Sequence, residues 1–167
     1  MLASAPAWGN PTAPQVVNGA ASFNQAGKLL TVTNSNGAII NWQSFNIGQG
    51  QTVQFFQPDA NSRVLNRVSG PDPTRISGNL LSNGIVYITN AAGVFFAHGS
   101  LVNVGGIYAS AGNISNTDFL AGRSHFTGVQ GAVQNDGTIN SPAAHLIGQR
   151  VANYGSINAP NGMVTMS

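Results

Sequence analysis

An internal repeat of 18 residues near the C-terminus is the feature that most restricts the fold of this chain. Residues 131–148, shifted by 18, align with residues 149–166 with six identities. Unrelated sequence of ordinary composition would give roughly one identity. The identical pairs are Val133/Val151, Asn135/Asn153, Gly137/Gly155, Ile139/Ile157, Asn140/Asn158 and Pro142/Pro160, and Leu146 over Val164 adds an apolar match. A period this short cannot hold two helices and a turn, but it fits one coil of three short strands.

Coils of this kind stack into a solenoid of the parallel β-helix type, in which like residues of successive coils lie about 4.8 Å apart. The repeat therefore predicts ladders of identical side chains. The apolar pairs, expected in the dry interior, are Val133/Val151 and Ile139/Ile157. The polar pairs, expected at corners with their amides bonded along the stack, are Asn135/Asn153 and Asn140/Asn158. Charged ladders would repel each other, which explains why only 6% of the residues are charged.

The middle of the chain contains short strands separated by corners that carry glycine. Residues 85–88, 94–96 and 106–108 are branched or aromatic runs of strand length, and none of them continues with helical spacing. Gly84-Ile85 recurs as Gly106-Ile107, 22 residues later. Residues 113–130 do not fit the 18-residue register and predict an excursion from the coil. The expected fold class is all-β, a parallel β-helix with one extra-helical excursion.

Composition excludes several classes of function. The net charge of +2 arises from six dispersed Lys and Arg residues against four Asp, so nucleic-acid binding is not expected. The chain has no cysteine for a disulfide framework and no run of 18 apolar residues that would cross a membrane as a helix. The three histidines, His98, His125 and His145, lack a second ligand at zinc-like spacing, so neither a metal nor a cofactor is expected.

Many β-helices act on carbohydrates, and such an enzyme would need paired carboxylates on one groove. The four aspartates, Asp59, Asp72, Asp118 and Asp136, are spread along the chain. We therefore do not expect an enzyme, although a polysaccharide-active one is an alternative. A stand-alone glycan-binding adhesive domain is the other alternative.

A spaced set of motifs carries a resemblance to a known family. The motifs are Ile40-Asn41-Trp42, Phe45-Asn46-Ile47-Gly48, Val53-Gln54-Phe55, Leu65-Asn66-Arg67-Val68, Ile76-Ser77-Gly78, Asn83-Gly84 and Val102-Asn103-Val104-Gly105-Gly106. Together they resemble the N-terminal secretion (TPS) domain of two-partner-secretion exoproteins, the family of filamentous haemagglutinin and related adhesins and haemolysins. The resemblance is close over residues 39–110 and extends loosely over nearly the whole chain.

The resemblance implies a right-handed parallel β-helix with short capping strands at its N-terminus. It also implies that the domain is a monomer that targets a large adhesin-like exoprotein to its transporter and nucleates β-helix folding. The transporter would be an outer-membrane β-barrel whose POTRA domains recognise the domain in the periplasm of a Gram-negative-type bacterium. The exoprotein would then reach the cell surface or the medium.

Two sets of residues are candidates for transporter recognition under this resemblance. The family's Asn-Pro-Asn-Gly-Ile motif reads here Asn90-Ala91-Ala92-Gly93-Val94, and the second set is Asn66-Arg67. The family's other frequent motif, Asn-Pro-Asn-Leu, is absent. The alternative for 90–94 is a corner turn whose backbone angle requires glycine. The alternative for Asn66-Arg67 is a surface cap.

The sequence also predicts how the chain is divided. Residues 1–14 are expected to be a leader remnant or flexible N-terminus, because Ala3-Ser4-Ala5 resembles the end of a secretory signal. Residues 15–167 are expected to form a single β-helix secretion domain, a fragment of a larger exoprotein. Residues 163–166 read as a strand that expects another coil.

Overall fold

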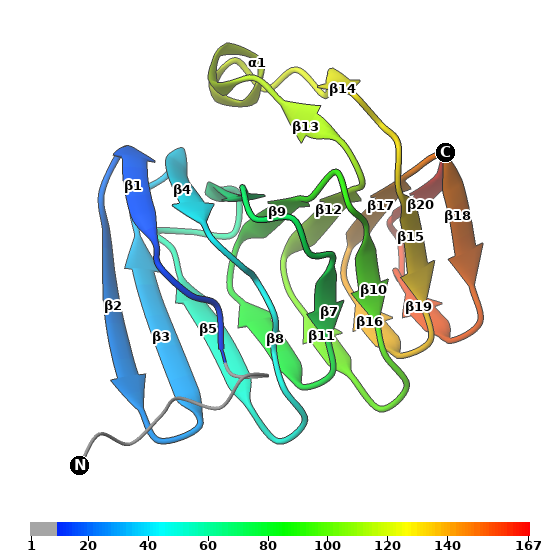
Figure 1. Ribbon diagram of the computed structural model, residues 1–167, viewed down its shortest axis with the longest axis horizontal. Helices are drawn as coiled ribbons and strands as arrows, with labels where there is room; N and C mark the ends of the chain where they lie inside the picture. Colours follow the sequence, from blue (N-terminus) through cyan, green and yellow to red (C-terminus); the bar gives the residue numbers. More distant parts are fainter. Residues whose placement is uncertain (1–9) are drawn as a thin grey trace.

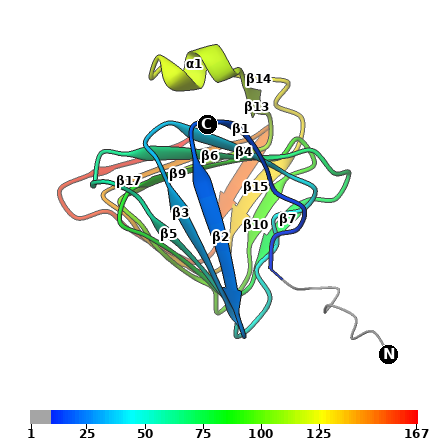
Figure 2. The ribbon, with the colours of Figure 1, turned by 90° about the vertical axis from the view of Figure 1, so that its left-hand side faces the viewer.

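The computed structural model describes residues 10–167, so residues 1–9 of the predicted leader (1–14) lie outside the described residues. The chain winds into a right-handed parallel β-helix whose coils follow one another along the long axis of the molecule (Figure 1). Three sheets form the sides of the solenoid, which has a triangular outline when viewed along its axis (Figure 2). The expected all-β fold, with capping strands and an excursion, is confirmed.

From β6 to β19, each coil passes through the three sheets in the same order. Sheet 1 contains β1 (Gln15–Asn18), β4 (Ala38–Trp42), β6 (Arg63–Val68), β9 (Ile85–Thr89), β12 (Gly106–Ser110), β17 (Ala143–Ile147) and β20 (Met163–Met166). Sheet 2 contains β7 (Thr74–Ile76), β10 (Val94–Phe96), β15 (Ala132–Asn135) and β18 (Arg150–Asn153). Sheet 3 contains β2 (Ala21–Ala26), β3 (Leu29–Asn34), β5 (Thr52–Phe56), β8 (Asn79–Ser82), β11 (Leu101–Asn103), β16 (Thr138–Asn140) and β19 (Ser156–Asn158).

Alternation of side chains along each strand builds the lumen of the solenoid. In sheet 1, one inward row runs from coil to coil through residues that are 0% exposed: Ala38, Val64, Val86, Ile107 and Ala144. Stacking of like apolar side chains excludes water from the lumen, and burial of apolar area is the main favourable term in folding. The lumen therefore needs no disulfide or metal to hold it.

Two matches proposed from the sequence are shifted in the structure. Leu146 pairs with Met166, and Ala144, not Leu146, pairs with Val164. The cause is the corner before β20, which spans residues 159–162, whereas the corner before β17 spans only 141–142. Similarly, Ile85 pairs with Gly106 and not with Ile107. Corner length varies because corners, unlike inward positions, are not constrained by packing.

The N-terminal end of the solenoid is closed by antiparallel strands. β1 pairs antiparallel with β4, and β2 pairs antiparallel with β3. Phe23 of β2 packs edge-on against the Trp42 ring, with ring centroids 5.5 Å apart. Thr12 forms an isolated bridge with Ser44, so the last residues of the predicted leader contact the first coil.

The excursion leaves the solenoid after β12 and returns at β15. It consists of β13 (Asn113–Ile114), helix α1 (Asn116–Leu120) and β14 (Phe126–Thr127), with β13 and β14 paired antiparallel. The excursion lies over the outer face of sheet 1, where both figures place it above β9 and β12 (Figures 1 and 2). The helix has only five residues, and no helix within 10–167 is long and apolar enough to cross a membrane.

Candidate functional site

The corner between β9 and β10 is formed by the predicted motif 90–94. Gly93 N donates to Asn90 O at 2.9 Å, which closes a turn around Ala91 and Ala92. The Asn90 side chain is 1% exposed. Its Nδ2 donates to Asp72 O at 2.9 Å and to Thr74 Oγ1 at 3.0 Å, while its Oδ1 accepts from Ala92 N at 3.0 Å. Asn90 thus ties this corner to the preceding coil.

The remaining motif residues divide into buried and exposed positions. Gly93 has a φ of 123°, and a Cβ there would lie 3.0 Å from Ala132 O, so the position favours glycine. Val94 is 0% exposed and belongs to the lumen core. Ala91 and Ala92 are exposed at the tip of the corner. In the folded domain these two alanines are therefore the part of the motif that a partner can reach.

Asn66 lies inside the lumen and not on the surface. It is 0% exposed and pairs in register with Ile40 and Ile88, which are both core residues. Trp42 Nε1 donates to Asn66 Oδ1 at 2.9 Å, and Asn66 Nδ2 donates to Tyr87 O at 3.2 Å. A buried amide with both ends bonded stabilises one alignment of neighbouring coils. The alternative that Asn66 is a surface cap is therefore wrong.

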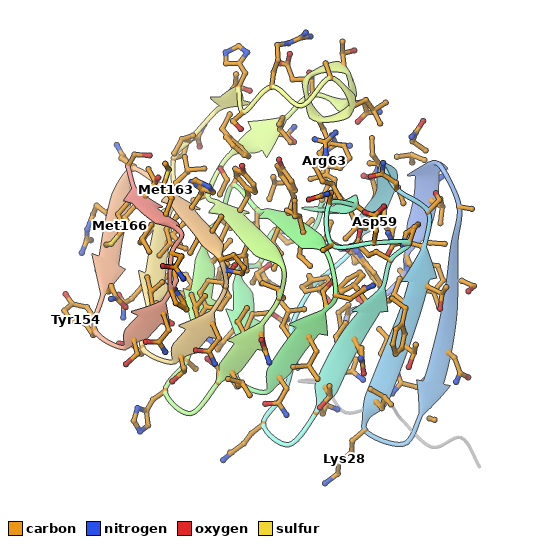
Figure 3. All side chains as sticks on the ribbon, turned by 180° about the vertical axis from the view of Figure 1, so that it is seen from behind. Lys28, Asp59, Arg63, Tyr154, Met163 and Met166 are labelled. Atoms are coloured by element: carbon orange, nitrogen blue, oxygen red, sulfur yellow. The ribbon has the colours of Figure 1, made fainter. Side chains whose placement is uncertain are left out.

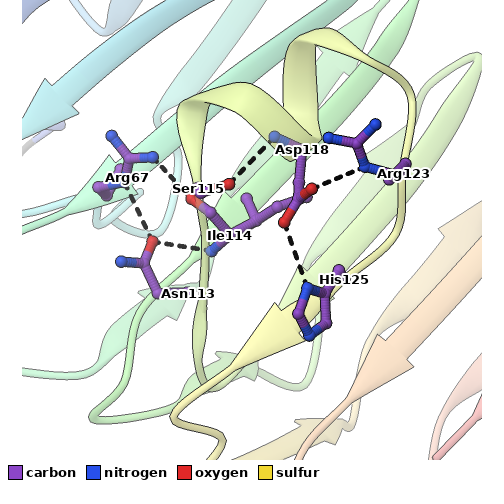
Figure 4. Close-up of polar contacts among 7 residues, drawn as sticks. All are labelled: Arg67, Asn113, Ile114, Ser115, Asp118, Arg123 and His125. Carbon is purple, nitrogen blue, oxygen red and sulfur yellow. Dashed lines mark hydrogen bonds and ion pairs between the residues drawn. The ribbon is translucent and has the colours of Figure 1, made fainter.

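Arg67 faces outward and holds the excursion against sheet 1 (Figure 4). Its Nη2 donates to Ile114 O at 2.7 Å and to Asn116 Oδ1 at 2.8 Å. Its Nε donates to Asn113 Oδ1 at 3.1 Å, and its Nη1 donates to Asn41 Oδ1 at 3.3 Å. Burial lowers the pKa of Arg67 from its ordinary value, but guanidinium groups stay charged at neutral pH. Arg67 thus joins β4 and β6 to the excursion.

Arg63, on the same outward face of β6, makes a second anchor that the sequence did not reveal. Its Nη1 donates to Phe119 O at 2.7 Å, and its guanidinium lies 4.9 Å from the centroid of the Phe119 ring. Phe119 is 0% exposed in a second apolar cluster, outside the lumen, with Ile39, Leu65 and Tyr87. The excursion therefore buries apolar side chains of three coils on the outer face of sheet 1.

Helix α1 starts from a capping residue and carries the ion pairs of the excursion. Ser115 is the N-cap, and its Oγ accepts from Asp118 N at 3.0 Å (Figure 4). The Ser-x-x-Asp spacing is a helix-start signal that could have been found in the sequence. Arg123 Nε donates to Asp118 Oδ1 at 2.8 Å, and His125 Nδ1 lies 3.3 Å from Asp118 Oδ2. The hydrogen bond from Arg123 is the main cause that lowers the pKa of Asp118.

Burial also changes the titration of the aromatic groups beneath the excursion. Burial, with the neighbouring Tyr108, raises the pKa of Tyr87 to about 12. Burial lowers the pKa of His145. Both shifts favour the uncharged forms at neutral pH. The region under the excursion is therefore an uncharged aromatic layer bordered by two arginines.

Comparison with known proteins shows the family of the chain. Residues 8–167 match the model of the TPS secretion domain. The chain belongs to this family. The solved structure of the HMW1 secretion domain from Haemophilus influenzae is 34% identical, with a TM-score of 0.86 over 89% of this chain and 42% of that one.

Two curated relatives of this TPS secretion domain are heme/hemopexin-binding proteins of Haemophilus influenzae. The relative from strain ATCC 51907 / DSM 11121 / KW20 / Rd is 35% identical over 170 residues, which cover 94% of this chain and 19% of the relative. The other is 35% identical over 102 residues, which cover 61% of this chain and 11% of the relative. The chain thus spans about a fifth of the longer match. TPS secretion domains belong to two-partner-secretion exoproteins, which cross the outer membrane of Gram-negative bacteria.

The structure of this TPS secretion domain brings together the four residue pairs that the sequence predicts as ladders. The paired residues are Val133 with Val151, Asn135 with Asn153, Ile139 with Ile157 and Asn140 with Asn158. Asn135 Nδ2 donates to Asn153 Oδ1 at 2.9 Å, and Asn158 Nδ2 donates to Asn140 Oδ1 at 2.8 Å. The two amide ladders differ, since Asn135 is 0% exposed inside the coil whereas Asn140 and Asn158 lie on the outside.

The four aspartates do not form a carboxylate pair. They lie in four separate connections: Asp59 between β5 and β6, Asp72 between β6 and β7, Asp118 in the excursion and Asp136 between β15 and β16. Within residues 10–167, no three His or Asp side chains gather in a group that could hold a metal ion. The family is one of secretion domains and not a known enzyme family.

Proposed function

We propose that residues 15–167 are the secretion-recognition module of a larger adhesin-like exoprotein. The module binds, as a monomer, the POTRA domains of a cognate outer-membrane β-barrel transporter in the periplasm, and it nucleates β-helix folding after export to the cell surface. The observation that carries this proposal is the match of residues 8–167 to the TPS secretion domain. The placement of the motif residues suggests when recognition takes place.

Three of the candidate recognition side chains are accessible only before the coils close. Asn66 and Val94 are 0% exposed and Asn90 is 1% exposed in the folded domain. A transporter that reads these side chains must therefore bind the chain while it is extended. Extended segments bind sheet edges by strand addition, with affinity from main-chain hydrogen bonds and selectivity from alternate side chains. The low charge of the chain, 6%, favours such binding because few charges need to be desolvated.

The two ends of the solenoid support a role in nucleating folding. The N-terminal end is covered by the antiparallel strands β1 and β2. At the other end, Tyr154, Met163 and Met166 are 75%, 62% and 44% exposed, and Figure 3 shows Tyr154 at the corner after β18 and the two methionines on β20. A coil added there would bury apolar surface at about 25 cal/mol per Å² and contact only its neighbour. Folding that begins at the capped end therefore proceeds outward, coil by coil.

The test compares binding of the two folding states to a purified POTRA fragment of the cognate transporter. Substitution of two lumen residues, Val86→Asp and Ile107→Asp, keeps the 167-residue chain unfolded, because both side chains are 0% exposed. We expect the POTRA fragment to bind this unfolded chain and to bind the folded wild type much more weakly. Circular dichroism establishes the folding state of each sample.

Two further substitutions test the motif residues. Asn66→Ala and Asn90→Ala, added to the unfolded variant, should weaken POTRA binding without any change in folding state. Absence of binding in both folding states would refute the proposed function. Equal binding of the folded and unfolded chains would refute recognition before folding.

A further inference from the structure

A column of stacked rings runs along the outer face of sheet 1. Tyr87, Tyr108, His145 and Thr165 occupy one row of the register from β9 to β20. The Tyr87 and Tyr108 ring centroids are 4.2 Å apart with an interplanar angle of 10°. Those of Tyr108 and His145 are 4.4 Å apart with an angle of 21°. The row therefore forms a continuous aromatic surface that ends at the His145 ring.

The excursion already places an aromatic side chain across this column. Phe126 of β14 stacks against Tyr87 and Tyr108, with ring centroids 6.5 Å and 6.3 Å apart. β14 is an extended segment of two residues, and the residue before it, His125, lies against Asp118, with its Nδ1 3.3 Å from Asp118 Oδ2. This intramolecular contact shows the chemistry that the column accepts, which is one aromatic ring on an extended segment.

A pocket of about 340 Å³ continues this contact surface toward the C-terminal end of the solenoid. Its lining residues are Tyr108, Ser124, Phe126, His145, Ile147, Thr165 and Ser167. Thr165 follows His145 in the row, and its small side chain cannot cover the face of an imidazole ring. The pocket thus lies where the next ring of the column would stack. Burial lowers the pKa of His145, so this wall of the pocket is uncharged at neutral pH.

We propose that this pocket binds one aromatic side chain of an extended partner polypeptide, which stacks on His145 and continues the column. Phe126 forms the side wall of the site, and the hydroxyls of Ser124 and Thr165 hydrogen-bond the main chain of the bound segment. The site goes beyond the proposed function, because it requires β12, β14, β17 and β20 to be folded. Transporter recognition, in contrast, takes place on the extended chain, so either proposal can fail without the other.

The test uses the complete 167-residue chain and two capped tripeptides, Ac-Gly-Trp-Gly-NH2 and Ac-Gly-Leu-Gly-NH2. NMR follows the imidazole protons of His145, with those of His98, which lies outside the pocket lining, as an internal control. We expect the tryptophan peptide to shift the His145 signals upfield by its ring current. Its affinity should exceed that of the leucine peptide by roughly five- to tenfold, the usual advantage of an aromatic pair.

Two variants locate the site. In Thr165→Phe the new phenyl ring fills the pocket. The imidazole signals of His145 should therefore be shifted upfield in the free protein and should no longer respond to the tryptophan peptide. His145→Leu keeps an apolar side chain but removes the stacking surface, so the Tyr108 signals should respond to the peptide at least fivefold more weakly. Equal responses to the two peptides, no response, or an unchanged response of either variant would overturn the proposal.

Discussion

Removal of the Arg67 guanidinium should open the excursion while the solenoid stays folded. Arg67→Met keeps most of the apolar stem and removes all four hydrogen bonds to Asn41, Asn113, Ile114 and Asn116. Three of these four acceptors lie on the excursion, so the substitution weakens the contact between the excursion and sheet 1 more than it weakens the solenoid. The perturbation is therefore local.

The magnitude follows from the exposure of the acceptors. A hydrogen bond to a charged group contributes about 1.5–3 kcal/mol when it is shielded from water. The bonds to Asn113 and Asn116 are exposed and contribute little, because water replaces the donor. Of the two part-buried bonds, only that to Ile114 O joins β6 to the excursion, since Asn41 lies on β4 of the solenoid and its bond to Arg67 does not break when the excursion opens. We expect the variant to reduce the free energy of opening of the excursion by about 2 kcal/mol, which is on the order of 30-fold in the opening equilibrium.

Native-state amide hydrogen exchange measures this opening directly. The amides of Phe119 and Ala121 are bonded within the excursion, to Ser115 O and Thr117 O. They should exchange on the order of 30-fold faster in Arg67→Met, while the amide of Val86, in the coil, keeps its rate. The matched control is Arg123→Met, because Arg123 is on the excursion but its side chain is 59% exposed in its pair with Asp118. An exposed ion pair contributes at most about 1 kcal/mol, so this control should change exchange by less than about fivefold. Equal effects of the two variants, or a parallel acceleration at Val86, would refute the role assigned to Arg67.

Three further predictions concern the motif corner, the ladder and pH. Asn90→Ala removes three hydrogen bonds, one buried and two part-buried, and should cost about 2–3 kcal/mol, which calorimetry would record as a fall in Tm of roughly 5–10 °C. Ile139→Ala should lower the free energy of unfolding in urea by about 3 kcal/mol, and Ile157→Ala by about half as much, because Ile139 is 0% exposed and Ile157 is only partly buried; equal losses would contradict the ladder argument. Because burial lowers the pKa of His145, the unfolded chain binds this proton more readily, so stability should fall as the pH drops below about 6.5. His145→Phe should flatten that part of the stability curve in urea titrations between about pH 5 and 8, and a wild type that gained stability on acidification would contradict the assignment.

The ladder could be predicted from the sequence because equivalent positions of successive coils have the same packing environment. Ile139 and Ile157 are identical since both fill one lumen position, and the structure pairs them directly. The limit of this reasoning lies at the corners. The corner at 159–162 is two residues longer than that at 141–142, so the match of Leu146 with Val164 was wrong although both are apolar. The apolar character of a residue determines whether it faces the lumen. The length of the preceding corner determines which residue of the neighbouring coil it pairs with.

The excursion was predicted only as a break in the repeat. Its anchors, Arg63 and Arg67, are 56 and 47 residues away from their partners Phe119 and Ile114, and nothing local in the sequence links them. The burial of Asn66 and Asn90 could not be predicted either, because asparagine is usually a surface residue. Both amides are satisfied by groups from a neighbouring coil, which a reading of single strands does not bring together.

The buried asparagines select one register between neighbouring coils, which apolar ladders alone specify only weakly. A lumen lined by similar apolar rows allows a coil to slip along its neighbour with little loss of apolar contact, just as strand register is weakly specified in uniform sheets. A slip would leave the Asn66 amide without Trp42 Nε1, and the Asn90 amide without Asp72 O and Thr74 Oγ1. Each orphaned buried amide costs about 1–3 kcal/mol, so these residues select one register. In the proposed mechanism the same side chains are read on the extended chain, and their burial on folding makes release from the transporter hard to reverse.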